Sequence, residues 1–366
     1  MKTIKTITCH DVYNVGAGLQ AYALVTYLSS QGYDAEILNY KPEYLSRHYR
    51  LNTVSNPKYD KPLIRQMYLL AKLPRRLRAL RSRKKKEFDL FSRQYLPVTQ
   101  KKFHSNEELC AASPFADAYI AGSDQIWNPL FKNGKDPAFY LDFVKRGKKI
   151  AYAASFAVEE LPLEMEEEVR NRLSSFDAIS VRESSGAGII HQLGLSAVKV
   201  CDPVFLLSRQ DWQQLIRDNV QDHQKYLFLY DFDDSDTIRM AAHQIAASQG
   251  LRILSYFPRN DVDGVDESGP LRFLRNMAKA SVVISNSFHA TAFSLIFHKE
   301  FYVVGRNEAI NTRMQDLLAE FGLEDRYLTH AEDVMFAAPI DWTKVDRLLA
   351  LQIQQSKLFL KKSLEI

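Results

Sequence analysis

Residues 281–297 read SVVISNSFHATAFSLIF, and the class of fold can be read from them. The β-branched start predicts a buried strand, NSFH predicts a short polar turn, and the apolar run predicts a helix beginning near His289. A buried strand that turns directly into a helix is typical of parallel sheets with crossover helices. Backbone N–H groups at the start of such a helix favour an anion, so Ser285, Ser287 and His289 are candidate anion-binding residues.

The same unit recurs on both sides of this stretch. Further strands are predicted at 3–9, 35–40, 116–122, 148–155 and 177–183 in the first half, and at 197–201, 225–231, 251–257 and 300–305 in the second. Helices are predicted at 17–31, 209–218, 235–249, 270–279, 289–298 and 312–321. Strands that alternate with helices along a whole chain indicate an α/β fold, here with two Rossmann-like domains facing a cleft.

The length supports two domains, because 366 residues exceed what one hydrophobic core usually serves. We expect an N-terminal domain over 1–183, a C-terminal domain over 184–342 and a last helix over 343–366. The first domain carries a mostly helical, basic insertion at 62–95. We expect this insertion to be broken or kinked at Pro74, because proline lacks an N–H donor.

The composition is that of an ordinary globular protein, with 46% hydrophobic and 25% charged residues, and excludes a disordered chain. The N-terminus lacks the continuous apolar segment of a signal peptide, and no stretch approaches the ~20 apolar residues of a membrane-spanning helix. Cys9, Cys110 and Cys201 are odd in number and far apart, which is typical of buried thiols in a reducing compartment. We therefore expect the protein to stay in the cytoplasm.

Polar residues stand at the ends of two other predicted strands, where parallel sheets bind ligands. AGSDQIWNP at 121–129 brings Ser123, Asp124 and Trp127 after a glycine turn. Asp124 is a candidate base for a hydroxyl proton, and Trp127 is either a flat face for a sugar or a core side chain. Arg182 ends the strand in SVRE, where it suits a phosphate or carboxylate, or else a salt bridge to a neighbour.

Gly16, Gly18 and Ala21 fit the G-x-G-x-x-A form of the dinucleotide fingerprint. That fingerprint follows directly on a strand, whereas six residues separate Cys9 from Gly16. A glycine turn that lets a helix pack, or a loop that faces substrate, is therefore better supported than an NAD or FAD site. A nucleophile elbow, clustered histidine ligands and a Walker loop are also missing from the sequence, so we expect no metal and no cofactor.

Seven motifs, in this order, resemble the polysaccharide pyruvyltransferase family: GAGLQAYAL, GSDQIWN, YAASF, SVRE, CDPVFLL, SFHATAFSLIF and NTRMQDLL. The resemblance covers most of the chain and rests on the ordered set rather than on one motif. It implies two domains of the GT-B glycosyltransferase type. It also implies an enzyme that transfers the enolpyruvyl carbon of phosphoenolpyruvate to two hydroxyls of a sugar, forming a cyclic ketal and releasing phosphate. The acceptors that it implies are bacterial surface saccharides, often lipid-linked.

The resemblance also implies roles for single residues. Arg182 and His289 would hold the donor together with Ser285 and Ser287, with His289 the candidate proton donor and Asp124 the candidate base. The acceptor would contact residues that all come from the first domain: Asn14, Gly16, Gln20, Ser123, Asp124, Gln125, Trp127 and Ser155.

One position departs from the family pattern. Many members have an arginine two residues before this histidine, and here that position is Ser287. Arg306 or Arg313 could supply the missing charge by approaching from the next loop. Two alternatives stay open, namely a nucleotide-sugar glycosyltransferase on the same fold and a non-catalytic saccharide-binding protein.

The insertion holds a run of basic residues. Between Lys72 and Lys86 lie nine lysines and arginines and no acidic residue. Five leucines at helical spacing accompany them: Leu69, Leu70, Leu73, Leu77 and Leu80. A basic amphipathic helix over 69–86 suits peripheral contact with an anionic membrane, or else a solvated helix that packs its leucines on the protein. Nucleic acid is a poorer partner, because no aromatic residues interleave with the charges.

Overall fold

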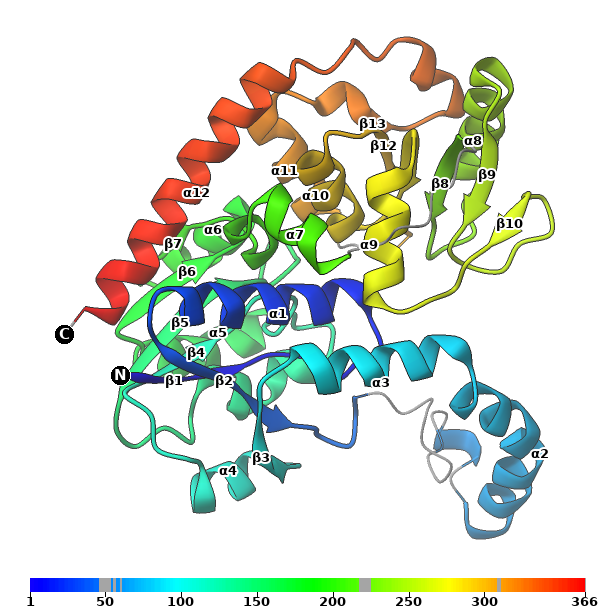
Figure 1. The fold of residues 1–366 in the computed structure, drawn as a ribbon. Coiled ribbons are helices and arrows are strands. Elements are labelled where there is room, and N and C mark those ends of the chain that lie inside the picture. Colours follow the sequence, from blue (N-terminus) through cyan, green and yellow to red (C-terminus); the bar gives the residue numbers. More distant parts are fainter. Residues whose placement is uncertain (46–53, 55–56, 60, 217–224, 308–310, 366) are drawn as a thin grey trace.

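The computed structural model describes residues 1–45, 54, 57–59, 61–216, 225–307 and 311–365. Within them the chain forms two parallel sheets, one in the lower and one in the upper part of Figure 1. The strands of the first sheet are β1 (Thr3–Ile7), β2 (Asp34–Tyr40), β3 (Val98–Phe103), β4 (Ala118–Ala121), β5 (Lys148–Ala154), β6 (Ala178–Val181) and β7 (Val198–Lys199). Those of the second are β8 (Tyr226–Tyr230), β9 (Arg252–Ser255), β10 (Gly264–Val265), β11 (Val282–Ser285), β12 (Glu300–Val304) and β13 (Tyr327–Leu328).

Both sheets share one strand order. The first runs β3-β2-β1-β4-β5-β6-β7, the second runs β10-β9-β8-β11-β12-β13, and the pairings are parallel. In a sheet of this Rossmann order, the direction of winding reverses between the first strand and the fourth, and ligands bind at that switch point. The switch points here are β1/β4 and β8/β11. The predicted fold class, two Rossmann-like domains, is confirmed.

Helices cover both sheets. Those of the first domain, apart from the insertion, are α1 (Val15–Ser30), α4 (Asn106–Ala112), α5 (Leu163–Leu173) and α6 (Ser184–Gln192). Those that follow are α7 (Arg209–Leu215), α8 (Asp236–Gln249), α9 (Pro270–Lys279), α10 (Phe288–Phe297), α11 (Thr312–Phe321) and α12 (Trp342–Leu364). Short 3-10 turns are η2 (Pro57–Tyr59), η3 (Lys132–Lys135), η4 (Pro137–Tyr140), η5 (Pro203–Leu206), η6 (Glu324–Arg326) and η7 (Ala331–Met335). Their ends follow local chemistry: the Ser287 hydroxyl caps α10 by accepting from Ala290 N, and Gly322 ends α11 in the left-handed conformation.

The insertion connects β2 to β3 and contains two helices, α2 (Pro62–Leu80) and α3 (Arg83–Tyr95). The break expected at Pro74 is wrong, because α2 continues through this proline to Leu80. The helices separate at Arg81 and Ser82, where the Ser82 hydroxyl caps α3 by accepting a hydrogen bond from Lys85 N. A capping serine supplies the acceptor that a new helix start needs, so the insertion divides at Ser82.

One strand lies in a different sheet from the one expected. The sequence groups the segment 197–201 with the strands of the second domain. In the structure β7 pairs with Ser180 and Val181 of β6 and forms the edge of the first sheet. The first sheet therefore continues beyond residue 183, and the chain leaves it through η5 and α7.

A shared apolar core joins the two domains. Tyr22 of α1 packs on Trp212 of α7, with ring centroids 5.8 Å apart, and Trp212 packs edge-on against Phe293 of α10 at 5.1 Å. The last helix, α12, leaves the second domain and returns to the first, as Figure 1 shows. Lys148 of β5 donates to the carbonyl of Ser363 near its end, at 3.0 Å. The C-terminal helix thus belongs to both domains.

The three cysteines are free thiols, with Cys9 and Cys201 buried and Cys110 half-buried. Among the helices of the described residues, none combines the length and the apolar character that crossing a lipid bilayer requires.

Candidate functional site

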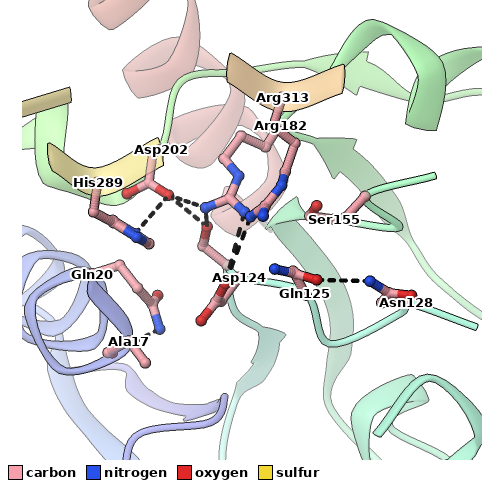
Figure 2. Close-up of polar contacts among 12 residues, drawn as sticks. Ala17, Gln20, Asp124, Gln125, Asn128, Ser155, Arg182, Asp202, His289 and Arg313 are labelled. Atoms are coloured by element: carbon pink, nitrogen blue, oxygen red, sulfur yellow. Dashed lines mark hydrogen bonds and ion pairs between the residues drawn. The ribbon is translucent and has the colours of Figure 1, made fainter. Parts of the chain in front are cut away.

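Three of the predicted polar residues, Asp124, Arg182 and His289, gather with Asp202 where the two switch points face each other. Asp124 lies just beyond β4, and His289 lies in the first turn of α10, beyond β11. Arg182 follows β6, and Asp202 precedes η5. Figure 2 shows these side chains pointing toward one another from both domains. The arrangement follows the rule that ligands bind at the carboxyl ends of parallel strands.

Asp202 is the centre of the cluster. Its Oδ2 accepts from Arg182 Nη1 at 2.5 Å and from the Ser123 hydroxyl at 3.0 Å, and it lies 3.6 Å from His289 Nε2. Its other oxygen accepts from Val204 N at 3.0 Å. Burial alone would raise the pKa of Asp202, but His289 and Arg182 outweigh it and hold that pKa well below its usual range. Asp202 is therefore a buried, permanent negative charge that joins an arginine of one domain to a histidine of the other.

Two buried arginines lie side by side above this carboxylate. The Cζ atoms of Arg182 and Arg313 are 4.3 Å and 5.8 Å from the ring centroid of Phe288. Asp124 Oδ1 is 3.8 Å from Arg182 Nη2 and 4.0 Å from Arg313 Nη1. Burial, and then the charge of Arg182, lower the pKa of Arg313 to about 10. Two neighbouring positive charges repel each other, and a bound anion would offset this repulsion.

Several N–H groups of this pair have no acceptor. Within the described residues, Nε and Nη2 of Arg182 and Nε of Arg313 are buried without a hydrogen-bond partner, and so is His289 Nε2. Leaving a buried donor unpaired costs about 1–3 kcal/mol, and more for a charged group. Donors of this kind favour a ligand with several anionic oxygens, for which arginine has the matching geometry.

Asp124 has an unusual backbone. Its φ is +74°, a left-handed conformation that non-glycine residues adopt at a cost of about 1–2 kcal/mol. Its carbonyl accepts from Ser155 N at 3.1 Å and from Ile126 N at 2.8 Å, which fixes the turn. The conformation directs the carboxylate toward the two arginines, where the side chain keeps 19% of its exposure. Strain held in this way is typical of functional positions.

Glu183 supports the wall of the site from behind. Its Oε1 accepts from the Ser155 hydroxyl at 2.9 Å and from the backbone N–H groups of Phe156 and Ala157 at 2.9 Å and 3.1 Å. Ser155 is fully buried, so it holds this wall rather than the expected acceptor.

The first turns of α1 approach His289 closely. A Cβ on Gly16 would lie 2.0 Å from His289 Nδ1, so only glycine fits there. Gln20 is fully buried and donates to Thr8 Oγ1 at 2.9 Å and to Ala17 O at 3.0 Å. Asn14 is exposed and caps α1. Gly16 therefore lies inside a helix that packs against a histidine, and not in the phosphate-binding turn of a dinucleotide fingerprint.

Several side chains of the expected site are engaged within the fold. Of the two roles stated for Trp127, the structure shows the core one, because the ring is fully buried and donates to Phe139 O at 3.0 Å. Ser285 donates to Tyr230 O at 2.7 Å and Ser287 caps α10, so both hydroxyls are occupied within the fold. Arg306 pairs with Asp233 at 3.2 Å, away from the Arg182 cluster. The half-buried Gln125 accepts from Asn128 Nδ2 at 2.7 Å.

A cavity of about 130 Å³ lies against the two arginines on the side of α11 and α12. Arg182, Asp202, Phe288 and Arg313 form one end, and the opposite wall carries Asp316 and Glu320, which Lys199 engages. The end formed by the arginines is therefore the one that suits an anion.

Asp202 is the functional residue that the sequence reasoning missed. It belongs to CDPVFLL, and a signal was present, because an aspartate follows a predicted strand and precedes a proline. Nothing local reveals that its partners are Arg182 and His289, which stand 20 and 87 residues away.

Comparisons with known proteins identify the type of fold and the family. A UDP-N-acetylglucosamine 2-epimerase of known structure is similar over 99% of this chain and 95% of its own, at 9% identity and a TM-score of 0.55. That of Methanocaldococcus jannaschii is similar over 96% and 92%, at 11% identity and a TM-score of 0.48. The first likeness shows the fold alone, which is of the GT-B type. The comparison with curated protein sequences finds no match. A sequence model described as polysaccharide pyruvyl transferase matches residues 14–308, most of the chain, and the protein belongs to that family.

Proposed function

We propose that the protein transfers the enolpyruvyl group of phosphoenolpyruvate to a sugar diol of a surface saccharide. One observation carries the proposal: the unpartnered, buried N–H groups of Arg182 and Arg313 lie beside His289 at the junction of the two domains. Phosphoenolpyruvate is small and carries both a carboxylate and a phosphate. Two guanidinium groups and an imidazole match these charges without a groove for a nucleotide.

Arg313 takes the place of the arginine that many family members have two residues before the histidine. It reaches the site from α11, beyond the matched residues 14–308, and packs on Phe288 beside Arg182. Of the two arginines considered from the sequence, Arg306 is the weaker candidate because Asp233 holds it. In this proposal Arg182 and Arg313 together bind the donor.

The reaction needs two proton transfers. Asp124 accepts a proton from an acceptor hydroxyl, whose oxygen attacks the central carbon of the enol as His289 protonates the methylene carbon, which becomes a methyl group. The second hydroxyl then attacks the same carbon, the bond to the phosphate oxygen breaks, and phosphate leaves with the second proton. A positioned acid or base of this kind contributes about 10²–10⁴-fold.

Asp202 suits His289 to the role of acid. Its carboxylate lies 3.6 Å from Nε2 and orients the imidazole. As the acid delivers its proton, Arg182 keeps Asp202 paired. Asp202 does not touch the substrate in this scheme and acts as a positioning residue.

The acceptor is a saccharide, and we propose a lipid-linked precursor of a capsule or exopolysaccharide. Such a carrier would place the enzyme in the cytoplasm at the inner face of the membrane. Asp124, Gln125 and Asn14 are the partly or fully exposed members of the expected acceptor set and would line its path.

Ligand-dependent thermal unfolding tests the donor. Phosphoenolpyruvate should raise the melting temperature, while uridine and guanosine nucleotide sugars should not, because a ligand stabilises the folded state that binds it. Stabilisation by the nucleotide sugars alone would instead assign a glycosyltransferase.

Phosphate release with a panel of lipid-linked galactosides, mannosides and glucosides then tests the reaction. His289→Ala, with the fold intact, should abolish this release, whereas undiminished release would refute the assigned acid. Binding without turnover of any acceptor would favour a non-catalytic saccharide-binding protein.

A further inference from the structure

The basic run of the insertion is divided between two helices with different surroundings. On α3, Arg83 pairs with Glu87 at 2.6 Å, Lys84 with Glu267 at 3.0 Å and Lys85 with Asp89 at 2.6 Å. Lys84 also lies 5.6 Å from the ring centroid of Tyr256. The charges of α3 therefore serve to attach the insertion to the second domain and to itself.

Helix α2 has a different environment. It projects from the body of the molecule beyond α3, as Figure 1 shows. Tyr68 stacks on Tyr59 of η2, with ring centroids 5.0 Å apart, while Leu69, Leu73 and Leu80 are half-buried. These residues give α2 one inward side.

The outward side of α2 is apolar. Met67 is 72% exposed, Leu70 68%, Ile64 43% and Leu77 37%. Met67, Leu70 and Leu77 follow at intervals of three and seven residues, which puts them along one side of the helix. Leaving several large apolar side chains together in water is unfavourable, and such a row usually marks a contact surface.

Basic residues continue this row toward the end of the helix. Arg75 and Arg78 lie in α2 and Arg81 is its C-cap residue, and all three are exposed. They stand eleven residues, or about three turns, after Ile64, Met67 and Leu70, so they continue the apolar row along the same side. An exposed helix side that is apolar in its first part and basic in its last part matches the boundary of an anionic lipid layer, where the apolar side chains enter the acyl region and the cations meet headgroup phosphates.

We propose that α2 is a docking helix for anionic phospholipid, formed by Ile64, Met67, Leu70 and Leu77 with Arg75, Arg78 and Arg81. The proposal narrows the basic run expected from sequence to its first half. It keeps Leu70 and Leu77 of the leucine pattern and adds Ile64 and Met67. It does not depend on the proposed reaction, because lipid binding can be measured without turnover.

Flotation of the full-length protein with vesicles tests the proposal. Vesicles of phosphatidylcholine with phosphatidylglycerol should carry the protein upward at low salt, and vesicles of phosphatidylcholine alone should not. High salt should weaken the binding, because screening shortens the range of surface charges. Met67→Glu with Leu70→Glu, and separately Arg75→Glu with Arg78→Glu, should each reduce the bound fraction at least about tenfold.

Matched controls lie on α12, where Leu351 and Leu358 are exposed apolar residues and Lys361 and Lys362 are exposed basic ones. Leu351→Glu with Leu358→Glu, and Lys361→Glu with Lys362→Glu, should leave flotation unchanged. Thermal unfolding of each variant confirms that it folds. Failure of the wild-type protein to float at low salt overturns the proposal. An equal loss of flotation in the α2 variants and the α12 variants also overturns the proposal. A dimer seen by sedimentation and abolished by Met67→Glu with Leu70→Glu, without any effect on flotation, would assign the row to self-association instead.

Discussion

His289 Nδ1 lies where Gly16 leaves room for it: a Cβ on Gly16 would come within 2.0 Å of that nitrogen. The imidazole of the second domain therefore packs directly on the backbone of α1 in the first domain. Its other nitrogen lies 3.6 Å from Asp202 Oδ2. The position of the proposed acid depends on one missing methyl group.

Gly16→Ala should lower the rate of phosphate release at least about tenfold, because the added carbon displaces the imidazole from Asp202. Gly18→Ala is the matched control. It lies in the same helix, but its Cβ would meet Phe91 at 3.6 Å, an ordinary contact. This control should keep its activity and gain up to about 1 kcal/mol in free energy of unfolding from helix propensity. Equal activity of the two variants would contradict the assigned role of the contact.

Asp202→Asn should lower the free energy of unfolding by about 3 kcal/mol at neutral pH, because Arg182 would remain buried without its partner. The folded-state pKa of Asp202 lies below its unfolded value of about 3.9, so its charge stabilises the fold above that pH. This stabilisation is lost as the pH falls toward the folded-state pKa. Urea unfolding across pH should thus show a difference between wild type and variant that shrinks below about pH 4. The exposed Asp34→Asn should stay within about 0.5 kcal/mol of wild type, and a difference independent of pH would contradict the assignment.

Arg313→Met should have opposite effects on the stability of the protein and on its affinity for the donor. Burial lowers the pKa of Arg313 to about 10, so below that pH its charge costs folding free energy, and the cost disappears as the pH rises above it. Methionine has a similar length without the charge. At neutral pH the ligand-free variant should gain about 1–3 kcal/mol in free energy of unfolding and bind phosphoenolpyruvate at least about tenfold more weakly. As a control, Arg306→Met should leave the affinity for phosphoenolpyruvate, measured by calorimetry, unchanged. Weaker binding in Arg306→Met together with unchanged binding in Arg313→Met would assign the donor-binding role to Arg306.

Trp127→Phe should reduce the free energy of unfolding by about 1–3 kcal/mol, because it leaves a cavity and removes the hydrogen bond to Phe139 O. The KM for the saccharide acceptor should not change, since the ring lies in the core. A higher KM without a loss of stability would restore the sugar-stacking role.

The sequence predicts best those helices and strands whose ends are determined by residues next to them in the chain. The helices at 270–279 and 312–321 were placed at their observed bounds, because Pro270 suits the first turn of α9 and Gly322 ends α11. The strand, turn and helix around His289 were found for the same reason. A residue's own neighbours decide where such elements start and stop.

The errors concern features set by residues far away in sequence. Val198 and Lys199 belong to the first sheet because they pair with β6, which no local pattern specifies. The choice between the two roles of Trp127, which the sequence left open, likewise depends on Tyr140 and Phe156, which pack against its ring at 5.6 Å and 5.3 Å. The candidate site follows the same division, since strand-end positions of Asp124 and Arg182 were predictable and the link through Asp202 was not.

The domains contact each other at several separate places, including the shared apolar core and the last helix. Besides α12, helix α3 reaches the second domain, where the Glu87 carboxylate accepts a hydrogen bond from Gly269 N at 2.7 Å. A hinge rotation of one domain about α12 would have to break the contact made by α3. This favours a fixed arrangement of the two domains. Contacts that hold the imidazole and guanidinium groups at a fixed spacing lower the conformational entropy that a substrate must remove on binding.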